Sequence, residues 1–431
     1  RACADSAFAG QMKQMPPAAH INFMMGQRNL AQGLDWVGTL KEGPGTATVH
    51  LKRRLTGEPL ALVVNTEGDR AFVSGIGQAP PPPGPAVVVK SDEDMAAQLE
   101  EYVSKLAGAD VFSGAVLLAH NGKVVFSKAY GIANKDFDAP NNIDTRFNLG
   151  SMNKMFTAVA VAQLVEQGKV SYDDPLSKYT DFPNPDAAKK IKIKHLLTHT
   201  SGLGSYFNEE FDRTSRARYK TVDQMLELAK GETLAFEPGT RWSYSNTGML
   251  VLGKVIEEAS GKDYFTYIRD HVYAPAGMTR SDSYELDYVN PNLAVGYEKE
   301  YLPNGEIRYR NNVFQHVIKG GPAGGGYSTV GDLLRFAEAL KSGKLVSAAT
   351  FELLTTPKPE IGSPSYGYGF STGGGKGPVG HSGGFPGISS NLDIFKDSGW
   401  VAVVQSNYGG GSQPVTQKMR QLIAARARPT S

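Results

Sequence analysis

Residues 147–155 read Phe-Asn-Leu-Gly-Ser-Met-Asn-Lys-Met and open a strongly apolar run that stops at Gly168. The run predicts a buried helix, with Ser151 at its N-terminus and Lys154 one turn later on the same face. A helix N-terminus offers free N–H groups and a positive field to a developing anion. A lysine on a buried helix is pushed towards its neutral form, which can take a proton from a hydroxyl. Ser151 and Lys154 are therefore a candidate nucleophile and its activating base.

The Ser-x-x-Lys pattern is weak by itself, because chance matches are expected in a chain of this length. The alternative interpretation is a capping serine followed by a solvated lysine. In this sequence the pattern occurs once, at the start of the most apolar predicted helix. That position favours the chemical interpretation.

A second motif is Tyr244-Ser245-Asn246. A tyrosine beside a cation can have a lowered pKa and act as a general base on a serine. The asparagine two residues on points the same way in an extended loop, where its amide can bind a substrate carbonyl or orient the lysine. Tyr288-Val289-Asn290 matches the same pattern, so this motif is also weak alone.

A third motif, His381-Ser382-Gly383-Gly384, lies at the end of a predicted strand. Its glycines allow a ligand to approach the backbone, and an exposed N–H there can complete an oxyanion hole with that of Ser151. Lys341-Ser342-Gly343 competes for the same role. It follows a predicted helix over 332–340, where lysine and glycine are ordinary helix-end residues, and we discount it.

The order and spacing of the three motifs resemble the serine β-lactamase-like superfamily, which includes penicillin-binding DD-peptidases, class C β-lactamases, D-aminopeptidases and carboxylesterases. The Tyr-Ser-Asn form is similar to class C enzymes and esterases. The resemblance spans about residues 90–425 and includes the segments 193–203, 322–329 and 381–387. It implies an α+β fold with a β-lactamase/transpeptidase-like catalytic domain. In that domain an antiparallel sheet is flanked by helices, one over 92–107 and one at the C-terminus, beside a helical lobe over 168–325.

The resemblance also implies roles for individual residues. Ser151 is the acylated nucleophile, Lys154 its activating partner, and Tyr244 the general base of acylation, which also helps to activate the deacylating water. Asn246 contacts the acyl group of the substrate. The other implied site residues are the backbone amides of Ser151 and Gly384 as the oxyanion hole and His381 in the third motif. We also expect Gly383, Tyr327 and Phe385 to contact the substrate. The two aromatic residues are chosen from a set of pocket candidates that also includes Trp242, Tyr206, Phe207 and Phe314.

His381 departs from the lactamase pattern, in which a lysine supplies a permanent positive charge near the carboxylate of penicillins and peptides. Histidine is mostly neutral at pH 7. This departure argues against strong β-lactamase activity. Esterases and D-amino-acid peptidases of the superfamily tolerate histidine there.

The proline run within 79–89 predicts a stiff linker between two domains. Residues 1–78 are expected to form a small α+β domain, with a helix over 5–33 laid on strands at 34–41, 45–54, 59–66 and 69–76. Residues 90–431 are expected to form the catalytic domain. Its clearest predicted elements are a helix over 92–107, a hairpin of strands 114–119 and 123–130 joined by Asn121-Gly122, strands at 379–381, 388–395 and 400–406, and a closing helix over 413–427.

Composition narrows the function further. Lys+Arg 45 minus Asp+Glu 43 gives a net charge of +2, so the sequence has no excess of positive charge that would indicate nucleic-acid binding. No apolar run approaches the roughly 20 residues of a membrane-spanning helix. The single cysteine, Cys3, excludes an internal disulfide and a Cys-based metal site. The usual cellular locations of superfamily members imply a periplasmic or extracellular location, for a secreted enzyme whose signal peptide has been removed.

His195 and His199 have the i, i+4 spacing of a metal-binding pair on one helix face. No glutamate lies between them and no third ligand is evident. We therefore expect neither a metal nor an organic cofactor, and interpret this segment as a structural turn that leads to the site.

These observations predict a serine hydrolase that cleaves an ester or amide bond through an acyl-enzyme on Ser151. An esterase or a D-amino-acid peptidase or amidase fits best, acting on a small molecule or a short peptide. Two alternatives remain open: a penicillin-binding or peptide-sensing module that acylates with little turnover, and a non-catalytic binding protein on the same fold.

Overall fold

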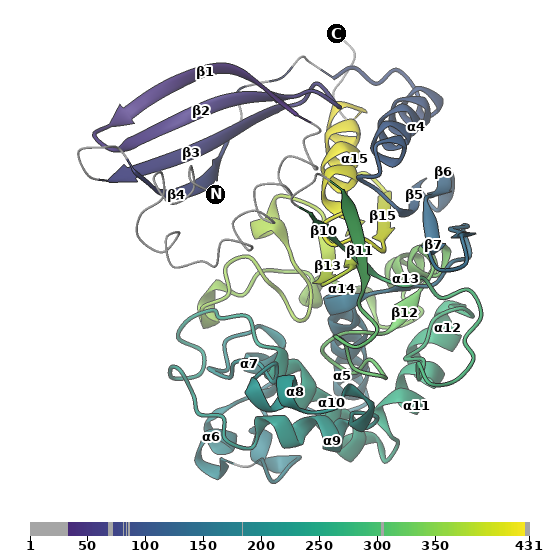
Figure 1. Ribbon diagram of the computed structural model, residues 1–431. Helices are drawn as coiled ribbons and strands as arrows, with labels where there is room; N and C mark the ends of the chain where they lie inside the picture. Colours follow the sequence, from purple (N-terminus) through teal and green to yellow (C-terminus); the bar gives the residue numbers. More distant parts are fainter. Residues whose placement is uncertain are drawn as a thin grey trace. The chain divides into compact units, whose positions relative to one another are not determined.

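Figure 1 shows the computed structural model of the chain, which describes residues 33–67, 72–80, 82, 84, 87–182, 184–302 and 306–426. The described residues form two compact units. The first contains those up to Phe112, together with Glu298–Arg310 and 424–426. The second contains Ser113–Tyr297 and Asn311–Ile423. The predicted domain boundary at residues 79–89 stays a prediction.

The first unit contains a four-stranded antiparallel sheet of order β1-β2-β3-β4. Its strands are β1 (Leu34–Gly43), β2 (Thr46–Arg53), β3 (Pro59–Glu67) and β4 (Phe72–Ala79). The four predicted strands are confirmed, with the fourth shifted by three residues. Cys3 and the helix predicted over 5–33 lie outside the described residues.

The same unit contains α4 (Asp92–Gly108), which confirms the helix predicted over 92–107. The Ser91 side chain caps its N-terminus by accepting a hydrogen bond from the Asp94 N–H. The apolar side chains predicted for one helix face are all buried: Met95, Leu99, Val103 and Leu106.

The second unit is built on a five-stranded antiparallel sheet of order β13-β14-β15-β5-β6. Its strands are β5 (Gly114–His120), β6 (Lys123–Tyr130), β13 (Val379–Phe385), β14 (Ile388–Ile394) and β15 (Trp400–Ser406). The predicted hairpin is confirmed, since Asn121 and Gly122 both have positive φ, at 49° and 76°, as a two-residue type I′ turn requires. β13 is longer than predicted and lies at one edge of the sheet.

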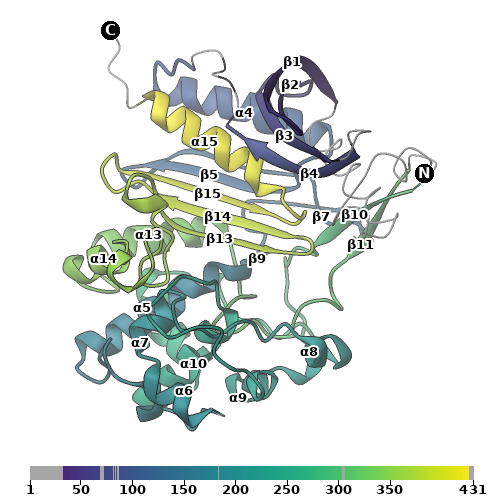
Figure 2. The ribbon, with the colours of Figure 1, turned by 90° about the vertical axis from the view of Figure 1, so that its left-hand side faces the viewer.

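Helices cover both faces of this sheet (Figure 2). On one face lies α15 (Ser412–Arg426), where Arg420 makes an ion pair of 2.6 Å with Asp393 of β14. On the other face lies α13 (Val330–Lys341), which contacts β15 and β5. The expectation of an antiparallel sheet flanked by helices is therefore confirmed.

The helical part of the second unit is centred on α5 (Asn153–Glu166), which follows directly from a 3-10 turn, η1 (Gly150–Met152). α5 is buried on almost every side and packs on α10 (Asn246–Ser260) and on β13. The Phe156 ring makes edge contacts with Tyr273 and Phe336 at 5.2 and 4.7 Å. The apolar pattern of α5 thus places Ser151 between the sheet and the helices.

Shorter α-helices and strands lie between these elements. The helices are α6 (Pro185–Lys190), α7 (Ile193–Leu197), α8 (Glu209–Arg213), α9 (Val222–Leu226), α11 (Tyr264–Ile268), α12 (Ala274–Ala276) and α14 (Ala348–Leu354). The strands are β7 (Ile132–Asn134), β8 (Ala139–Pro140), β9 (Phe147–Asn148), β10 (Tyr297–Tyr301), β11 (Ile307–Asn311) and β12 (Tyr327–Ser328).

Candidate active site

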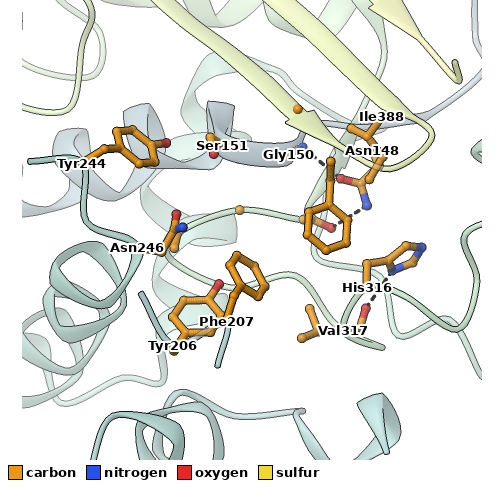
Figure 3. Close-up of a pocket in the computed structure, with 15 residues that line it drawn as sticks. Asn148, Gly150, Ser151, Tyr206, Phe207, Tyr244, Asn246, His316, Val317 and Ile388 are labelled. Carbon is orange, nitrogen blue, oxygen red and sulfur yellow. Dashed lines mark hydrogen bonds between the residues drawn. The ribbon is translucent and has the colours of Figure 1, made fainter. Parts of the chain in front are cut away.

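A pocket of about 260 Å³ in the second unit is lined by residues from all three motifs. Ser151 comes from η1, Tyr244 and Asn246 from the start of α10 and the loop before it, and Gly384 and Phe385 from the edge strand β13. Figure 3 shows Ser151 between Tyr244 on one side and Asn148 and His316 on the other. Segments far apart in the sequence therefore converge on the serine hydroxyl.

Lys154 lies beneath this pocket with no exposed surface. Its Nζ lies 2.9 Å from Asn246 Oδ1 and 2.5 Å from the carbonyl oxygen of Ala323, and both of these oxygens can only accept. A neutral amine has two N–H groups, so these contacts leave its lone pair for the third neighbour, Ser151 Oγ at 3.1 Å. Burial lowers the pKa of Lys154 well below its ordinary value, which favours this neutral form.

Tyr244 has its ring 4.8 Å from Lys154 Nζ. The sequence led us to expect a lowered pKa for this tyrosine, and that expectation is wrong. Burial raises the pKa of Tyr244 to about 12, against the opposing effect of its hydrogen bond with Ser151. The physical reason is that burial penalises the charged phenolate more than the hydrogen bond with Ser151 favours it.

Asn246 is held by the cap of α10. The Ser245 side chain accepts a hydrogen bond from the Gly248 N–H at 2.8 Å, and its hydroxyl donates to the Gly204 carbonyl at 2.9 Å. The amide of Asn246 donates to Ser205 Oγ at 3.2 Å, which turns its oxygen towards Lys154. Asn246 thus contacts the lysine, as the second of the two functions considered for it requires.

Strand register sets the direction of the Gly384 N–H. Phe385 and Ile388 pair across a two-residue turn, and antiparallel pairs alternate between bonded and non-bonded. Gly384 and Gly380 therefore both direct their N–H groups away from β14. The N–H of Gly380 donates to Ser371 on that outer edge at 3.1 Å, in agreement with this alternation.

The outer edge of β13 lies against η1. A Cβ on Gly383 would lie 1.8 Å from the Leu149 carbonyl oxygen, and a Cβ on Gly150 2.9 Å from the Gly384 nitrogen. Two glycines therefore allow this close approach. The approach brings the residues Ser151 and Gly384 to the same pocket wall.

His381 is not among the residues that line the pocket, and its side chain is hydrogen-bonded to other groups. Its Nδ1–H donates to the Ser382 carbonyl at 2.5 Å, and its Nε2 accepts a hydrogen bond from Tyr366 Oη at 2.8 Å. Burial lowers the pKa of His381 to about 3. The residue is therefore neutral at physiological pH, as expected from its type.

Of the three predicted substrate contacts, the structure places one in the pocket wall. Phe385 lines the pocket, with its ring 5.4 Å from that of Phe207. Gly383 packs on Leu149 and is not part of the pocket wall. Tyr327 is buried in β12 and lines a neighbouring cavity.

A family model described as Beta-lactamase matches residues 99–426. The chain belongs to the beta-lactamase family. It is 31% identical over 331 residues to penicillin-binding protein 4* of Bacillus subtilis, covering 72% of this chain and 71% of that relative. The crystal structure of a penicillin-binding protein from Bacillus halodurans superposes with a TM-score of 0.68 at 31% identity, covering 76% of this chain and 98% of that one.

A teichoic acid D-alanine hydrolase of Staphylococcus aureus is 29% identical over 245 residues, covering 57% of this chain and 58% of the relative. The predicted family, fold and enzyme class are thereby confirmed: the chain has the β-lactamase/transpeptidase-like fold, and it is a serine hydrolase. Within the part of the chain that the structure describes, every helix is too short or too polar to cross a membrane.

Sequence reasoning missed the role of His199 in this beta-lactamase-family site. His199 is fully buried and has a φ of 60°, which is rare for a residue with a side chain. Its carbonyl accepts the Ser243 N–H at 2.8 Å and its Nδ1 accepts the Ser245 N–H at 3.1 Å. The residues on both sides of Tyr244 are therefore bonded to one histidine, whose ring also packs 4.4 Å from the Tyr244 ring.

Two further residues were also missed. The Ala323 carbonyl bonds Lys154 and lies in the segment 322–329, whose small residues were a signal. His316 lines the pocket and lies in a stretch with no recognisable motif. The other histidine considered for metal binding, His195, accepts a hydrogen bond from the Lys192 N–H at its Nδ1. Lys341, the discounted competitor for the third motif, makes an ion pair with Glu338 at 3.0 Å.

Proposed function

We propose that the chain hydrolyses an ester or amide bond through a covalent acyl-enzyme on Ser151. The observation that carries this proposal is the set of three contacts around Lys154 Nζ. Two acceptors use both N–H groups of the neutral amine. Its lone pair then faces the Ser151 hydroxyl, which is the arrangement of a base and its nucleophile.

Acylation begins when Ser151 Oγ attacks the substrate carbonyl carbon and its proton passes to Lys154 Nζ. The carbonyl oxygen becomes an oxyanion. We assign the amides of Ser151 and Gly384 to stabilise it, supported by the register that turns the Gly384 N–H outward. Such donors act strongly because they are already oriented and shielded from water.

The intermediate then expels its alcohol or amine. Tyr244 is protonated at neutral pH, since its pKa is raised to about 12, and we assign its phenol to donate a proton to the leaving group. Lys154 returns the proton taken from Ser151 to the phenolate. In deacylation the same groups act in reverse order, with a water proton passing to the Tyr244–Lys154 pair and Ser151 reprotonated at the end.

The alternative of an acylating module with little turnover is supported by relatives named as penicillin-binding proteins. His381 argues against efficient recognition of penicillin, because it is neutral and turned towards Tyr366. A burst of product without a steady state would favour the alternative. We also propose a periplasmic or extracellular location, supported by relatives whose names refer to penicillin and to teichoic acid.

The test is labelling with a fluorophosphonate, followed by intact-mass and peptide analysis, together with turnover of p-nitrophenyl acetate and butyrate. We expect one adduct, on Ser151, and steady ester turnover. Ser151→Ala is expected to abolish the adduct and to lower kcat/KM by about four powers of ten.

Ser104→Ala, at an exposed serine of α4, is the matched control and should label and turn over as the parent does. Circular dichroism and thermal melting verify that both variants are folded. An adduct on another residue, or full turnover by Ser151→Ala, would exclude the proposed mechanism.

A further inference from the structure

The pocket that contains Ser151 has walls without formal charge. Among the described residues that line it, none is an Asp, Glu, Lys or Arg. Lys154 contacts Ser151 from below and has no exposed surface. A charged group bound here would lose its hydration and gain no ion pair, which is strongly unfavourable.

The proposed proton transfer sets the orientation of a substrate in the pocket. Figure 3 shows Tyr244 at one end and His316 and Val317 at the other, with Ser151 between them. The proposed proton donor to the leaving group is Tyr244, so the leaving group departs at that end. The acyl group then extends from Ser151 towards Ile388, Val317 and His316.

His316 offers a hydrogen-bond acceptor at the end of the pocket to which the acyl group extends. The residue is 8% exposed, and its Nδ1–H donates to the Val317 carbonyl at 3.0 Å. Because a neutral imidazole carries one N–H, its Nε2 bears a lone pair. Nε2 has no hydrogen-bond partner among the described residues, and burial lowers the pKa of His316, which keeps this lone pair free.

A second cavity of about 560 Å³ adjoins the pocket, and His316 lines both. In Figure 3 its ring is turned away from Ser151. The charged groups of the second cavity are already paired: Arg216 with Asp212 at 3.5 Å, and Asp287 with Lys220 at 2.8 Å. Among the described residues that line this cavity, each charged side chain therefore already has a partner of opposite charge.

We propose that the pocket binds an uncharged acyl group whose distal part carries a hydrogen-bond donor, a hydroxyl or an amide N–H, which His316 Nε2 accepts at the entrance to the second cavity. This inference rests on the proposed function, since it names the acyl specificity of that site. It assigns His316 as a specificity-determining residue with no part in the proton transfers.

The test uses p-nitrophenyl esters of straight acyl chains with four, six and eight carbons. Each chain ends in a methyl, a hydroxyl, a carboxylate or a trimethylammonium group. At one chain length or more we expect kcat/KM of the hydroxyl ester to exceed that of the methyl ester about fivefold. At every length both should exceed the two charged esters by about 100-fold or more.

The variants separate His316 from general pocket effects, because the readout is the hydroxyl-to-methyl ratio within each protein. His316→Phe is expected to reduce that ratio to about one, and His316→Gln, which retains an acceptor, to preserve a ratio above two. His271→Phe is the matched control, because His271 lines neither cavity, and should keep the parental ratio.

The failures are distinguishable. If Ser151 is not labelled and no ester is turned over, the proposed function and this inference both fail. If esters are hydrolysed but the charged chains react as fast as the methyl chain, the uncharged acyl site alone is overturned. If the hydroxyl preference is absent at every length, or survives in His316→Phe, the role of His316 is overturned.

Discussion

At the scale of single residues, one buried histidine links the two sides of the Tyr244 loop. His199 accepts hydrogen bonds from the N–H groups of Ser243 and Ser245, so the residues immediately before and after Tyr244 are both held in place. The ring contact at 4.4 Å adds a wall behind the phenol. We infer that His199 is a positioning residue, which acts on the reaction only through Tyr244.

His199→Leu removes the Nδ1 acceptor while filling the space, and should lower kcat for p-nitrophenyl acetate about 100-fold with KM changed less than about threefold. The reason is that small displacements of a catalytic group have large effects on rate. His199→Asn offers an acceptor in a similar position and tolerates a positive φ, so it should recover most of kcat. Steady-state kinetics measures both variants.

Thermal melting accompanies these measurements, because leucine at a positive φ is strained. If both variants lost kcat in proportion to their loss of stability, the role of His199 would be purely structural. A KM effect with unchanged kcat would place it in substrate binding instead.

At the scale of elements, the decisive feature is the approach of β13 to η1. The edge strand carries the Gly384 N–H, and η1 carries Ser151. Because Gly383 touches the Leu149 carbonyl, any side chain there must push the two elements apart. The glycines of the third motif therefore matter here for the distance between two elements.

Gly383→Ala is expected to lower kcat and the rate of fluorophosphonate labelling by about 100-fold, because its Cβ would lie 1.8 Å from the Leu149 oxygen and the two amides would separate. Gly377→Ala, just before β13, is the control, since its nearest neighbour is 4.0 Å away. Both variants are compared by stopped assays and by circular dichroism. Equal labelling rates for the two would show that the approach of β13 has no part in the chemistry.

At the scale of the whole molecule, buried neutral bases make stability depend on pH. Burial lowers the pKa of His381 to about 3 and that of His199 well below its ordinary value. The unfolded chain therefore binds more protons than the folded chain below pH ~6.5. Since stability rises with pH wherever the unfolded state binds more protons, the stability that these two histidines contribute is complete above pH ~6.5 and falls as the pH is lowered.

His381→Gln removes one of these groups. The free energy of unfolding by urea, measured between pH 4 and 6, should fall less steeply in the variant than in the parent, by about 1.4 kcal/mol per pH unit. The variant is expected to be less stable at pH 7.5, because glutamine cannot replace both hydrogen bonds of the imidazole. Parallel stability curves for the two proteins would contradict a neutral, buried His381.

The sequence by itself determined what depends on neighbours along the chain. The i, i+3 spacing placed Lys154 against Ser151, and the Asn121-Gly122 turn placed the hairpin. The apolar run of α5 predicted a buried helix, and the apolar period of α4 predicted which of its side chains are buried. These features are local, because backbone geometry and periodicity define them.

Only the tertiary structure decided the electrostatics of the site. The Ala323 carbonyl, 169 residues from Lys154, accepts a hydrogen bond from Lys154 Nζ. This contact is one of the two that leave the lone pair of the neutral amine for Ser151. The raised pKa of Tyr244 and the pairing of His381 with Tyr366 depend on segments brought together by folding. His316 gave no sequence signal, because its importance lies in its place between two cavities. Burial and solvation are set by the whole fold, so these properties cannot be derived from local sequence patterns.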